Sequence, residues 1–462
     1  MNYEEALKYI YSFADLERGV GFSGRSPARY RFQRVEHLMD ELGNPHRRLR
    51  FAHVAGSNGK GSTAAMLGSI AAAAGMRVGL YTQPHLHTFR ERIMVDSRPI
   101  SPGDFASLMD LVGGAVSRCV DRYPEEGDPT TFEIATVAAF EHFAEAGVDL
   151  AVIEVGLGGT WDATNVIDPA VSIITSLSLE HRAILGDTLG EIAGEKAGII
   201  KPGRPVVTIP QPPDAMNVIE RRARELGAPL RTVGPGSELC LDADNGIEWS
   251  DGCPLLDCRL RMADESYEMR LPLLGDHQLL NAAAAVGAAR ELARSGWDIK
   301  VEHIVQGLKD TAWPARFETL RQRPLLVVDG AHTPDACLRV RDALVNMGAG
   351  DIHLVYGAGV DKDALSMLLV FAPMVAGVYL CASDHPRAAP ASALLETAAG
   401  IDVPAREFDS VHEALAAAES RAGHDETILV TGSIFVAAEA REAKGLAGEI
   451  DPPILSRKTP AR

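Results

Sequence analysis

Short apolar runs alternate with amphipathic or alanine-rich stretches along the first two thirds of the chain. The stretches at 62–75 and 275–296 have the pattern of helices, and the first ends at Gly75, a residue suited to a left-handed C-cap. The apolar runs lack the polar alternation of half-exposed strands, which is typical of a parallel sheet covered on both faces. Four such runs are predicted as strands, at 50–56, 77–82, 148–156 and 170–178. This part of the chain is therefore predicted to form a doubly wound, mostly parallel α/β sheet.

The pattern changes near Thr311, where KDTAWPARFE contains a Trp-Pro break. A second alternation of strands and helices follows, with strands expected at 324–332, 351–359, 377–383 and 427–433. We therefore predict two domains, residues 1–310 and a smaller, Rossmann-like α/β domain at residues 311–462. The tail after Gly448 is expected to be disordered.

Composition excludes several classes of protein. The 462 residues are 46% hydrophobic and 23% charged, which is ordinary for a globular chain. The formal net charge of -18 argues against a general nucleic-acid binder, which needs a basic face. The acidic N-terminus is unlike a signal peptide, and the apolar stretch at 64–75 is too short to span a bilayer. The six cysteines lack zinc spacing. We expect a cytoplasmic protein with reduced thiols, no membrane contact and no nucleic-acid partner.

The segment HVAGSNGKGSTAAML, beginning at His53, differs from the common phosphate loop G-x-x-x-x-G-K-[ST]. Val54 stands where that loop has its first glycine, and Gly61 separates Lys60 from the hydroxyls. The simplest alternative is a turn rich in small residues. A strand, a glycine turn and a helix N-terminus nevertheless present backbone N–H groups to an anion, Lys60 adds a charge, and Ser62 offers a hydroxyl for Mg²⁺. The segment therefore predicts a nucleotide-binding P-loop.

Three further segments carry groups that a magnesium-dependent phosphoryl transfer uses. Glu154 ends a buried apolar run, where a carboxylate is costly unless a cation is near. His181 follows the next strand, and burial of Lys196 would depress its pKa. Simpler interpretations are a core carboxylate paired with a cation, a structural histidine and, for the nearby Lys201, a turn residue.

Taken in order, five motifs resemble the folylpolyglutamate synthases and dihydrofolate synthases of the Mur ligase superfamily. The motifs are AGSNGKGST, EVGLGGTWDATNVI, LGDTLGEIAGEKAGIIKPG, GDHQLLNAAAA and WPARFE…VVDGAHTPDA. The resemblance implies that ATP phosphorylates a carboxylate of a pterin-containing substrate. The amino group of L-glutamate then attacks the acyl phosphate, and a tetrahedral intermediate expels phosphate. Domain closure about a hinge at Thr311–Trp313 is implied as well.

The resemblance also implies a role for each matching residue. Lys60, Lys196 and His332 would be catalytic, with His332 where glutamate binds. Two Mg²⁺ ions are implied, with Lys196 carbamylated to support the second, and the metal-binding residues would be Ser62, Glu154, His181 and Lys196. ATP would be held by Asn58, Gly59, Lys60, Gly61, Ser62, Thr63, Asn281, Arg316 and Asp329. The pterin would contact Thr130, Phe132, Asp162 and Ala163.

Several positions depart from the family pattern, mainly around the pterin. Phe132 is alternatively an ordinary core residue. The departures are Gln83 for Ser, Thr88 for Arg, Thr160 for Arg, Glu180 for Asp and Thr333 for Asn. Arg90 and Arg92 lie close enough to Thr88 to substitute for the missing arginine. Whether the enzyme adds the first glutamate, extends a glutamate tail or does both stays open.

Two other functions remain as alternatives. A Mur-type ligase acting on another acid, such as a muramyl peptide, is the nearest, although no extra N-terminal domain for a UDP-sugar is evident. A P-loop ATPase that drives a partner's motion would need a standard loop and an Asp-ended strand, and it leaves DGAHTPDA without a role. We expect a monomer whose partners are small molecules.

Overall fold

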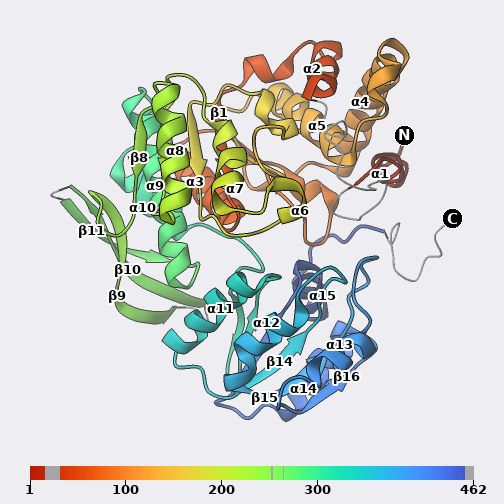
Figure 1. Cartoon of the computed structure of the whole chain (residues 1–462), viewed down its shortest axis with the longest axis vertical. Helices are drawn as coiled ribbons and strands as arrows, with labels where there is room; N and C mark the ends of the chain where they lie inside the picture. Colours follow the sequence, from red (N-terminus) through yellow and green to blue (C-terminus); the bar gives the residue numbers. More distant parts are fainter. Residues whose placement is uncertain (16–31, 251–252, 264, 453–462) are drawn as a thin grey trace.

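The computed structural model describes residues 1–15, 32–250, 253–263 and 265–452. Figure 1 shows an eight-stranded sheet with its helices in the upper part and a six-stranded sheet with its helices in the lower part. A three-stranded antiparallel sheet lies at one side, made of β9 (Leu239–Ser250), β10 (Cys253–Met262) and β11 (Glu265–Leu271). No helix of the described residues is long and apolar enough to cross a membrane.

The eight-stranded sheet has the order β4-β3-β2-β5-β1-β6-β7-β8. The pairs from β2 to β8 are all parallel, and at one edge β3 pairs antiparallel with both β2 and β4. The strands are β1 (Phe51–Ala55), β2 (Val78–Tyr81), β3 (Ile93–Val95), β4 (Arg98–Pro99), β5 (Leu150–Glu154), β6 (Val171–Ile174), β7 (Val206–Thr208) and β8 (Leu230–Thr232). The predicted doubly wound sheet is confirmed.

Alternate residues of the central strands enter two cores. Val54 packs in the core that contains α3 (Lys60–Ala73) and α9 (Asp276–Arg294), whereas Phe51 packs in the core that contains α4 (Pro102–Arg122) and α5 (Thr131–Ala146). Burial on both faces explains why β1, β5 and β6 are continuous apolar runs. The remaining helices of this part are α1 (Tyr3–Tyr11), α2 (Phe32–Glu41), α6 (Arg182–Leu185), α7 (Leu189–Lys196), α8 (Pro213–Glu225) and α10 (Val301–Lys309).

The six-stranded sheet has the order β12-β13-β17-β14-β15-β16, with only β12 antiparallel. Its strands are β12 (Glu318–Gln322), β13 (Leu325–Val328), β14 (Ile352–Tyr356), β15 (Val375–Leu380), β16 (Ala405–Glu407) and β17 (Thr427–Thr431). Its helices are α11 (Pro334–Asn346), α12 (Ala364–Phe371), α13 (Ala391–Ala398), α14 (Val411–Arg421) and α15 (Ile434–Ala443). The smaller C-terminal α/β unit is therefore confirmed, while its proposed first residue, Thr311, lies in the connection between α10 and β12 and stays a prediction.

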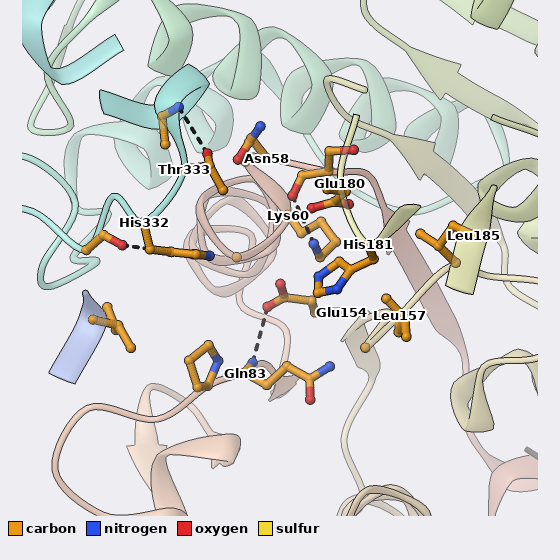
Figure 2. Close-up of a pocket in the computed structure, with 18 of the residues that line it drawn as sticks. Asn58, Lys60, Gln83, Glu154, Leu157, Glu180, His181, Leu185, His332 and Thr333 are labelled. Atoms are coloured by element: carbon orange, nitrogen blue, oxygen red, sulfur yellow. Dashed lines mark hydrogen bonds between the residues drawn. The ribbon is translucent and has the colours of Figure 1, made fainter. Parts of the chain in front are cut away.

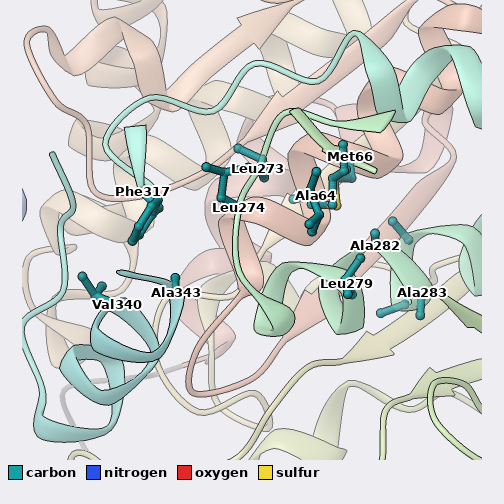
Figure 3. Close-up of a cluster of buried hydrophobic side chains, with 14 of the residues drawn as sticks. Ala64, Met66, Leu273, Leu274, Leu279, Ala282, Ala283, Phe317, Val340 and Ala343 are labelled. Atoms are coloured by element: carbon teal, nitrogen blue, oxygen red, sulfur yellow. The ribbon is translucent and has the colours of Figure 1, made fainter. Parts of the chain in front are cut away.

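One hydrophobic core continues from the first sheet towards the second (Figure 3). Leu273 and Leu274 lie between the α3–α9 contact and the residues from the C-terminal part. The labelled contributors are Ala64 and Met66 of α3, Leu279, Ala282 and Ala283 of α9, and Phe317, Val340 and Ala343. The two sheets are therefore joined by packed side chains as well as by the chain connection.

The expectation of disorder after Gly448 is wrong for residues 449–452. Asp451 accepts hydrogen bonds from the Tyr3 hydroxyl (2.5 Å) and the Phe89 N–H (2.7 Å), and its own N–H donates to His87 O (2.9 Å). Glu449 forms an ion pair with Arg90. The polar composition of this segment suggested a solvated tail, but its carboxylates accept hydrogen bonds from donors of the N-terminal part. Residues 453–462 lie outside the described part of the chain.

Free, buried thiols are found at Cys119, Cys240, Cys258, Cys337 and Cys381.

Candidate active site

A cavity of about 1700 Å³ lies between the carboxyl ends of the first sheet and the C-terminal part of the chain. Figure 2 shows Lys60, Glu154 and His181 facing it from the first sheet, with His332 and Thr333 on the other side. The predicted site residues line it, with two exceptions. Thr63 is buried behind the loop, and Lys196 is buried beneath it.

The predicted phosphate loop connects β1 to α3. Gly56 (φ +154°) and Gly59 (φ +86°) take conformations that favour glycine. A Cβ on Gly56 would lie 1.8 Å from Thr175 Oγ1, and one on Gly59 would lie 2.2 Å from Asn281 Oδ1. The glycines therefore let the end of β6 and helix α9 approach the loop. Lys60 Nζ donates to the carbonyls of Gly56 (3.0 Å) and Ser57 (3.2 Å), which holds its charge at the loop.

Glu154 and Ser62 lie at the buried end of the same loop. Glu154 is the last residue of β5 and only 4% exposed, and its Oε2 accepts the backbone N–H of Gln83 (3.3 Å). A Cβ on Gly61 would lie 3.3 Å from Glu154 Oε2, so the carboxylate borders the first turn of α3. Ser62 is 3% exposed and accepts a 3.5 Å contact from Gln278 Nε2. A carboxylate and a hydroxyl are oxygen donors that suit Mg²⁺.

Lys196 ends α7 with its side chain 2% exposed. Its Nζ donates to Gly56 O (2.8 Å) and Glu180 Oε1 (2.8 Å). Burial lowers the pKa of Lys196 to about 8, and the attraction of Glu180 offsets this only in part. Burial alone would raise the pKa of Glu180, but Lys60 and Lys196 outweigh it and hold that pKa at about 2. The phosphate loop is thus tied to a buried ammonium–carboxylate pair.

His181 follows Glu180 in the left-handed backbone region (φ 46°), an uncommon conformation that is concentrated at functional sites. Burial is the main cause that lowers its pKa, so its ring is neutral near pH 7 and able to ligate a cation. No three His, Cys, Asp or Glu side chains of the described residues converge as a ready-made metal site. Any cation here would therefore need further oxygens, such as those of a phosphate. Lys201 Nζ donates to Asn165 O (2.8 Å), in keeping with its interpretation as a turn residue.

The side of the cavity that is predicted to bind the nucleotide is completed by α9 and the C-terminal part. Asn281 Nδ2 donates to Gln278 Oε1 (2.9 Å). Asn58 Nδ2 reaches Asp335 Oδ2 (3.3 Å), which links the phosphate loop directly to α11. A Cβ on Gly61 would lie 3.1 Å from Trp313 Cζ2, so that indole packs on the loop. The sequence suggested only a hinge role for Trp313, because nothing in its local pattern reveals a contact with a loop so distant in sequence.

Asp329 is buried at the cavity wall, and its carboxylate accepts hydrogen bonds from backbone N–H groups. It accepts from Phe317 N (2.7 Å) and Ala331 N (2.7 Å), and Arg316 lies close enough to oppose the rise in pKa that burial causes. His332 lies open to the cavity, but the surrounding protein excludes enough water to lower its pKa to about 4. Its Nδ1 contacts Gly330 O (2.9 Å) and therefore carries the proton, so Nε2 is the free acceptor of a neutral ring.

The predicted pterin residues form the far end of the cavity. Phe132 stacks on Tyr81 with ring centroids 6.2 Å apart and lines the cavity. Thr130 Oγ1 accepts the N–H of Glu133 (3.2 Å) and thereby caps α5.

Asp162, which the resemblance places near the pterin, has a second task. Its carboxylate accepts from Gly156 N (3.0 Å), Leu157 N (2.9 Å), Thr164 N (3.0 Å) and Thr164 Oγ1 (2.5 Å). It therefore organises the loop after β5 and places Ala163 at the cavity wall.

The two arginines near Thr88 have different surroundings. Arg92 lines the cavity, and its Nε donates to His85 Nδ1 (2.9 Å). Arg90 instead donates to Ile100 O (2.9 Å) and pairs with Glu449 of the C-terminal segment. Of these two arginines, Arg92 is therefore the one placed to substitute for the family arginine whose position Thr88 occupies.

Family models match both parts of the chain. The Mur ligase middle domain matches residues 54–289, and the Mur ligase glutamate ligase domain matches residues 315–434. A folylpolyglutamate synthase of Lacticaseibacillus casei is 35% identical, with 96% of this chain and 98% of the relative covered. A dihydrofolate synthase/folylpolyglutamate synthase of Bacillus subtilis is 35% identical, with 88% and 94% covered.

A third relative is longer than this chain. It is a probable bifunctional folylpolyglutamate synthase/dihydropteroate synthase of Haloferax volcanii, 39% identical over 96% of this chain, which spans about half (50%) of the relative's length.

Two solved structures share the fold. An FPGS-AMPPCP-folate complex has a TM-score of 0.80 at 33% identity, with 97% of this chain and 100% of that chain covered. E. coli FolC in complex with DHPP and ADP has a TM-score of 0.81 at 29% identity, with 96% and 98% covered.

Proposed function

The chain belongs to the folylpolyglutamate synthase and dihydrofolate synthase family of Mur ligases, and from this premise we propose that it joins L-glutamate to a pterin-bearing carboxylic acid with cleavage of ATP to ADP and phosphate. The observation that carries the proposal is the cavity itself. It connects the phosphate loop, the ring of Phe132 and the ring of His332 in one space. An aromatic acid, a nucleotide and an amine can therefore meet there.

In the first step, a carboxylate oxygen of the pterin substrate attacks the γ-phosphorus of ATP and ADP leaves. Lys60 and the N–H groups at the start of α3 would hold the transferred phosphoryl group, since both present positive charge to it. Asn281 would contact the adenine, and Arg316 with Asp329 would reach ATP from the C-terminal part. In the second step, the glutamate amine adds to the acyl phosphate and phosphate leaves. His332, neutral at pH 7, would border the incoming amine.

The donor set suits two Mg²⁺ ions. Ser62 and Glu154 would hold one, and His181 with a modified Lys196 would hold the other. When bound, such cations neutralise the charge that develops on the phosphate oxygens.

Lys196 would serve as a metal-binding residue only as its carbamate. Its lowered pKa leaves more of the neutral amine, which is the form that adds CO₂. The carbamate would be negative beside the carboxylate of Glu180, so it would fit there only if a cation neutralised part of this charge. Carbon-13 NMR of protein equilibrated with labelled bicarbonate, with and without Mg·ATP, tests this, since the absence of a carbamate resonance in both samples would refute it.

We further propose that the enzyme works as a cytoplasmic monomer. One chain supplies residues from both sides of the cavity, and the buried free thiols suit a reducing compartment. Light scattering of the purified protein at working concentration tests the monomer directly.

The reaction itself is tested by phosphate release with Mg·ATP and L-glutamate, comparing dihydropteroate, tetrahydrofolate and no pterin, with products identified by mass. A gain of one glutamyl unit on dihydropteroate establishes the dihydrofolate synthase reaction, and a gain on tetrahydrofolate establishes the folylpolyglutamate synthase reaction. ATP binding without glutamylation of either pterin would contradict the proposal and favour another acid, such as a muramyl peptide.

A further inference from the structure

Gln83 has a buried side-chain amide that the roles above do not use. The residue follows β2, and its backbone N–H donates to Glu154 Oε2 (3.3 Å). Its side-chain nitrogen Nε2 is buried without a hydrogen-bond partner among the residues that the structure describes. A buried amide N–H without a hydrogen-bond acceptor costs about 1–3 kcal/mol of stability. Such a group therefore indicates an acceptor from outside the protein, such as a bound ligand.

The position of this amide is fixed by Gly156. A Cβ added to Gly156 would lie 2.7 Å from Gln83 Nε2 and 2.7 Å from Phe132 Cζ. The amide and the edge of the Phe132 ring therefore both pack against Gly156 at the cavity wall, and a Cβ at that position would collide with both. Gly156 is itself held by its N–H bond to Asp162 (3.0 Å).

Gln83 thus stands between the two ends of the cavity. Its backbone N–H contacts the carboxylate of Glu154 at the phosphate end (Figure 2). Its side chain adjoins Phe132 at the other end. A substrate whose ring packs on Phe132 and whose carboxylate reaches the phosphate loop must pass this amide. A lysine or arginine here would pair with Glu154, whereas a neutral amide keeps its N–H available for a substrate oxygen.

We propose that the side-chain amide of Gln83 donates a hydrogen bond to the reacting carbonyl oxygen of the substrate. This inference rests on the proposed ligase function and assigns a catalytic residue for its second step. When the amine nitrogen forms its bond to the acyl carbon, the π-electron pair of the carbonyl moves onto that oxygen, and the amide stabilises the resulting oxyanion. The pair then reforms the carbonyl, the bond to phosphate breaks, and phosphate leaves with the amine's proton. Gln83 keeps its own proton throughout.

The main test variant removes the hydrogen-bond donor without changing the length of the side chain, and two further variants alter the donor in other ways. Gln83→Met lacks the N–H groups, Gln83→Glu places an acceptor there, and Gln83→Asn keeps a donor on a shorter stem. Gln322→Met, at the exposed end of β12, is the matched control for the same exchange. For each variant, kcat and the KM for pterin and glutamate are measured, together with ADP affinity as a check that the fold is intact.

Removing one oxyanion donor typically lowers kcat by about 10²–10³-fold. We expect Gln83→Met to lose at least about 10²-fold in kcat, Gln83→Glu to lose more, and Gln83→Asn to recover part of the rate. Positional isotope exchange in ATP without glutamate reports acyl-phosphate formation, and it should change by only a few-fold because no oxyanion forms in that step. Gln322→Met should match the wild type in both assays.

Two results would overturn the inference. One is an unchanged kcat in Gln83→Met with a raised pterin KM, because the amide would then bind the ground state only. The other is an equal loss of isotope exchange and of kcat, which would place the amide in the first step. Both are distinct from failure of the proposed function, in which the wild-type enzyme itself would glutamylate no pterin.

Discussion

The two ends of the cavity are built in different ways. At the phosphate end, a single loop between β1 and α3 supplies the glycines, Lys60 and the helix N-terminus, and strand ends add the carboxylates. At the proposed pterin end, the wall comes from separate segments, including the start of α5, the residues after β2 and the loop after β5. The phosphate end therefore depends on one continuous motif, whereas the pterin end depends on how several segments are held together.

The largest expected effect is loss of Lys60 at the phosphate end. Lys60→Ala should abolish ATP turnover, a loss of at least about 10³-fold, because charge stabilisation dominates phosphoryl transfer. The fold should persist, since within the described part of the chain the side chain of Lys60 donates hydrogen bonds to two carbonyls of its own loop. Phosphate release measures the effect.

The matched control for this variant is Lys201→Ala. The ammonium of Lys201 contacts Asn165 O away from the loop, so this variant should turn over ATP normally. Wild-type turnover in Lys60→Ala would remove the assignment of the phosphate loop.

This difference in construction explains how much could be predicted from the sequence. The sheet and the phosphate end were predictable, because buried strands and a glycine loop leave local patterns. The contact of Trp313 with Gly61 and the bond from Asn58 to Asp335 could not be predicted, since each joins segments hundreds of residues apart.

At the proposed pterin end, the sequence around Asp162 did not reveal that this residue anchors a loop. Asp162 is a short polar residue in a loop, and the same sequence suits a ligand contact or a loop anchor. Its four hydrogen bonds make it an anchor in the fold, while its contact with the pterin stays a prediction. The C-terminal segment was mispredicted for a similar reason, because the donors that hold Asp451 belong to Tyr3 and Phe89.

A smaller effect is expected at the aromatic wall. Phe132→Leu keeps an apolar side chain but loses the flat face for a heterocycle, which is worth about 1–1.5 kcal/mol. The KM for the pterin should therefore rise about 5- to 13-fold, while the KM for ATP stays unchanged.

The control for the aromatic wall is Phe435→Leu, which removes a cavity-lining ring that stacks on His385 in the C-terminal part. It should leave the pterin KM unchanged. A rise in the ATP KM of Phe132→Leu would show that the two ends of the cavity are not separable.

The smallest effect concerns the segment that holds the pterin end in place. Asp451 joins the C-terminal part to Tyr3, His87 and Phe89, and the run from Gln83 to Arg92 supplies several residues of the wall.

Asp451→Asn weakens two charge-assisted bonds, so we expect a loss of about 1–2 kcal/mol in the free energy of unfolding. The pterin KM should rise two- to three-fold because the wall loses a support. The ATP KM should not change, since the hydrogen bonds of Asp451 go to the segments of Tyr3, His87 and Phe89 and not to the phosphate loop. Denaturant unfolding and steady-state kinetics measure both, with the exposed Asp298→Asn as the control. Equal increases in the KM values for pterin and ATP would mean that the C-terminal segment supports the whole cavity. The two ends of the cavity would then differ in their sequence patterns but not in how they are held in place.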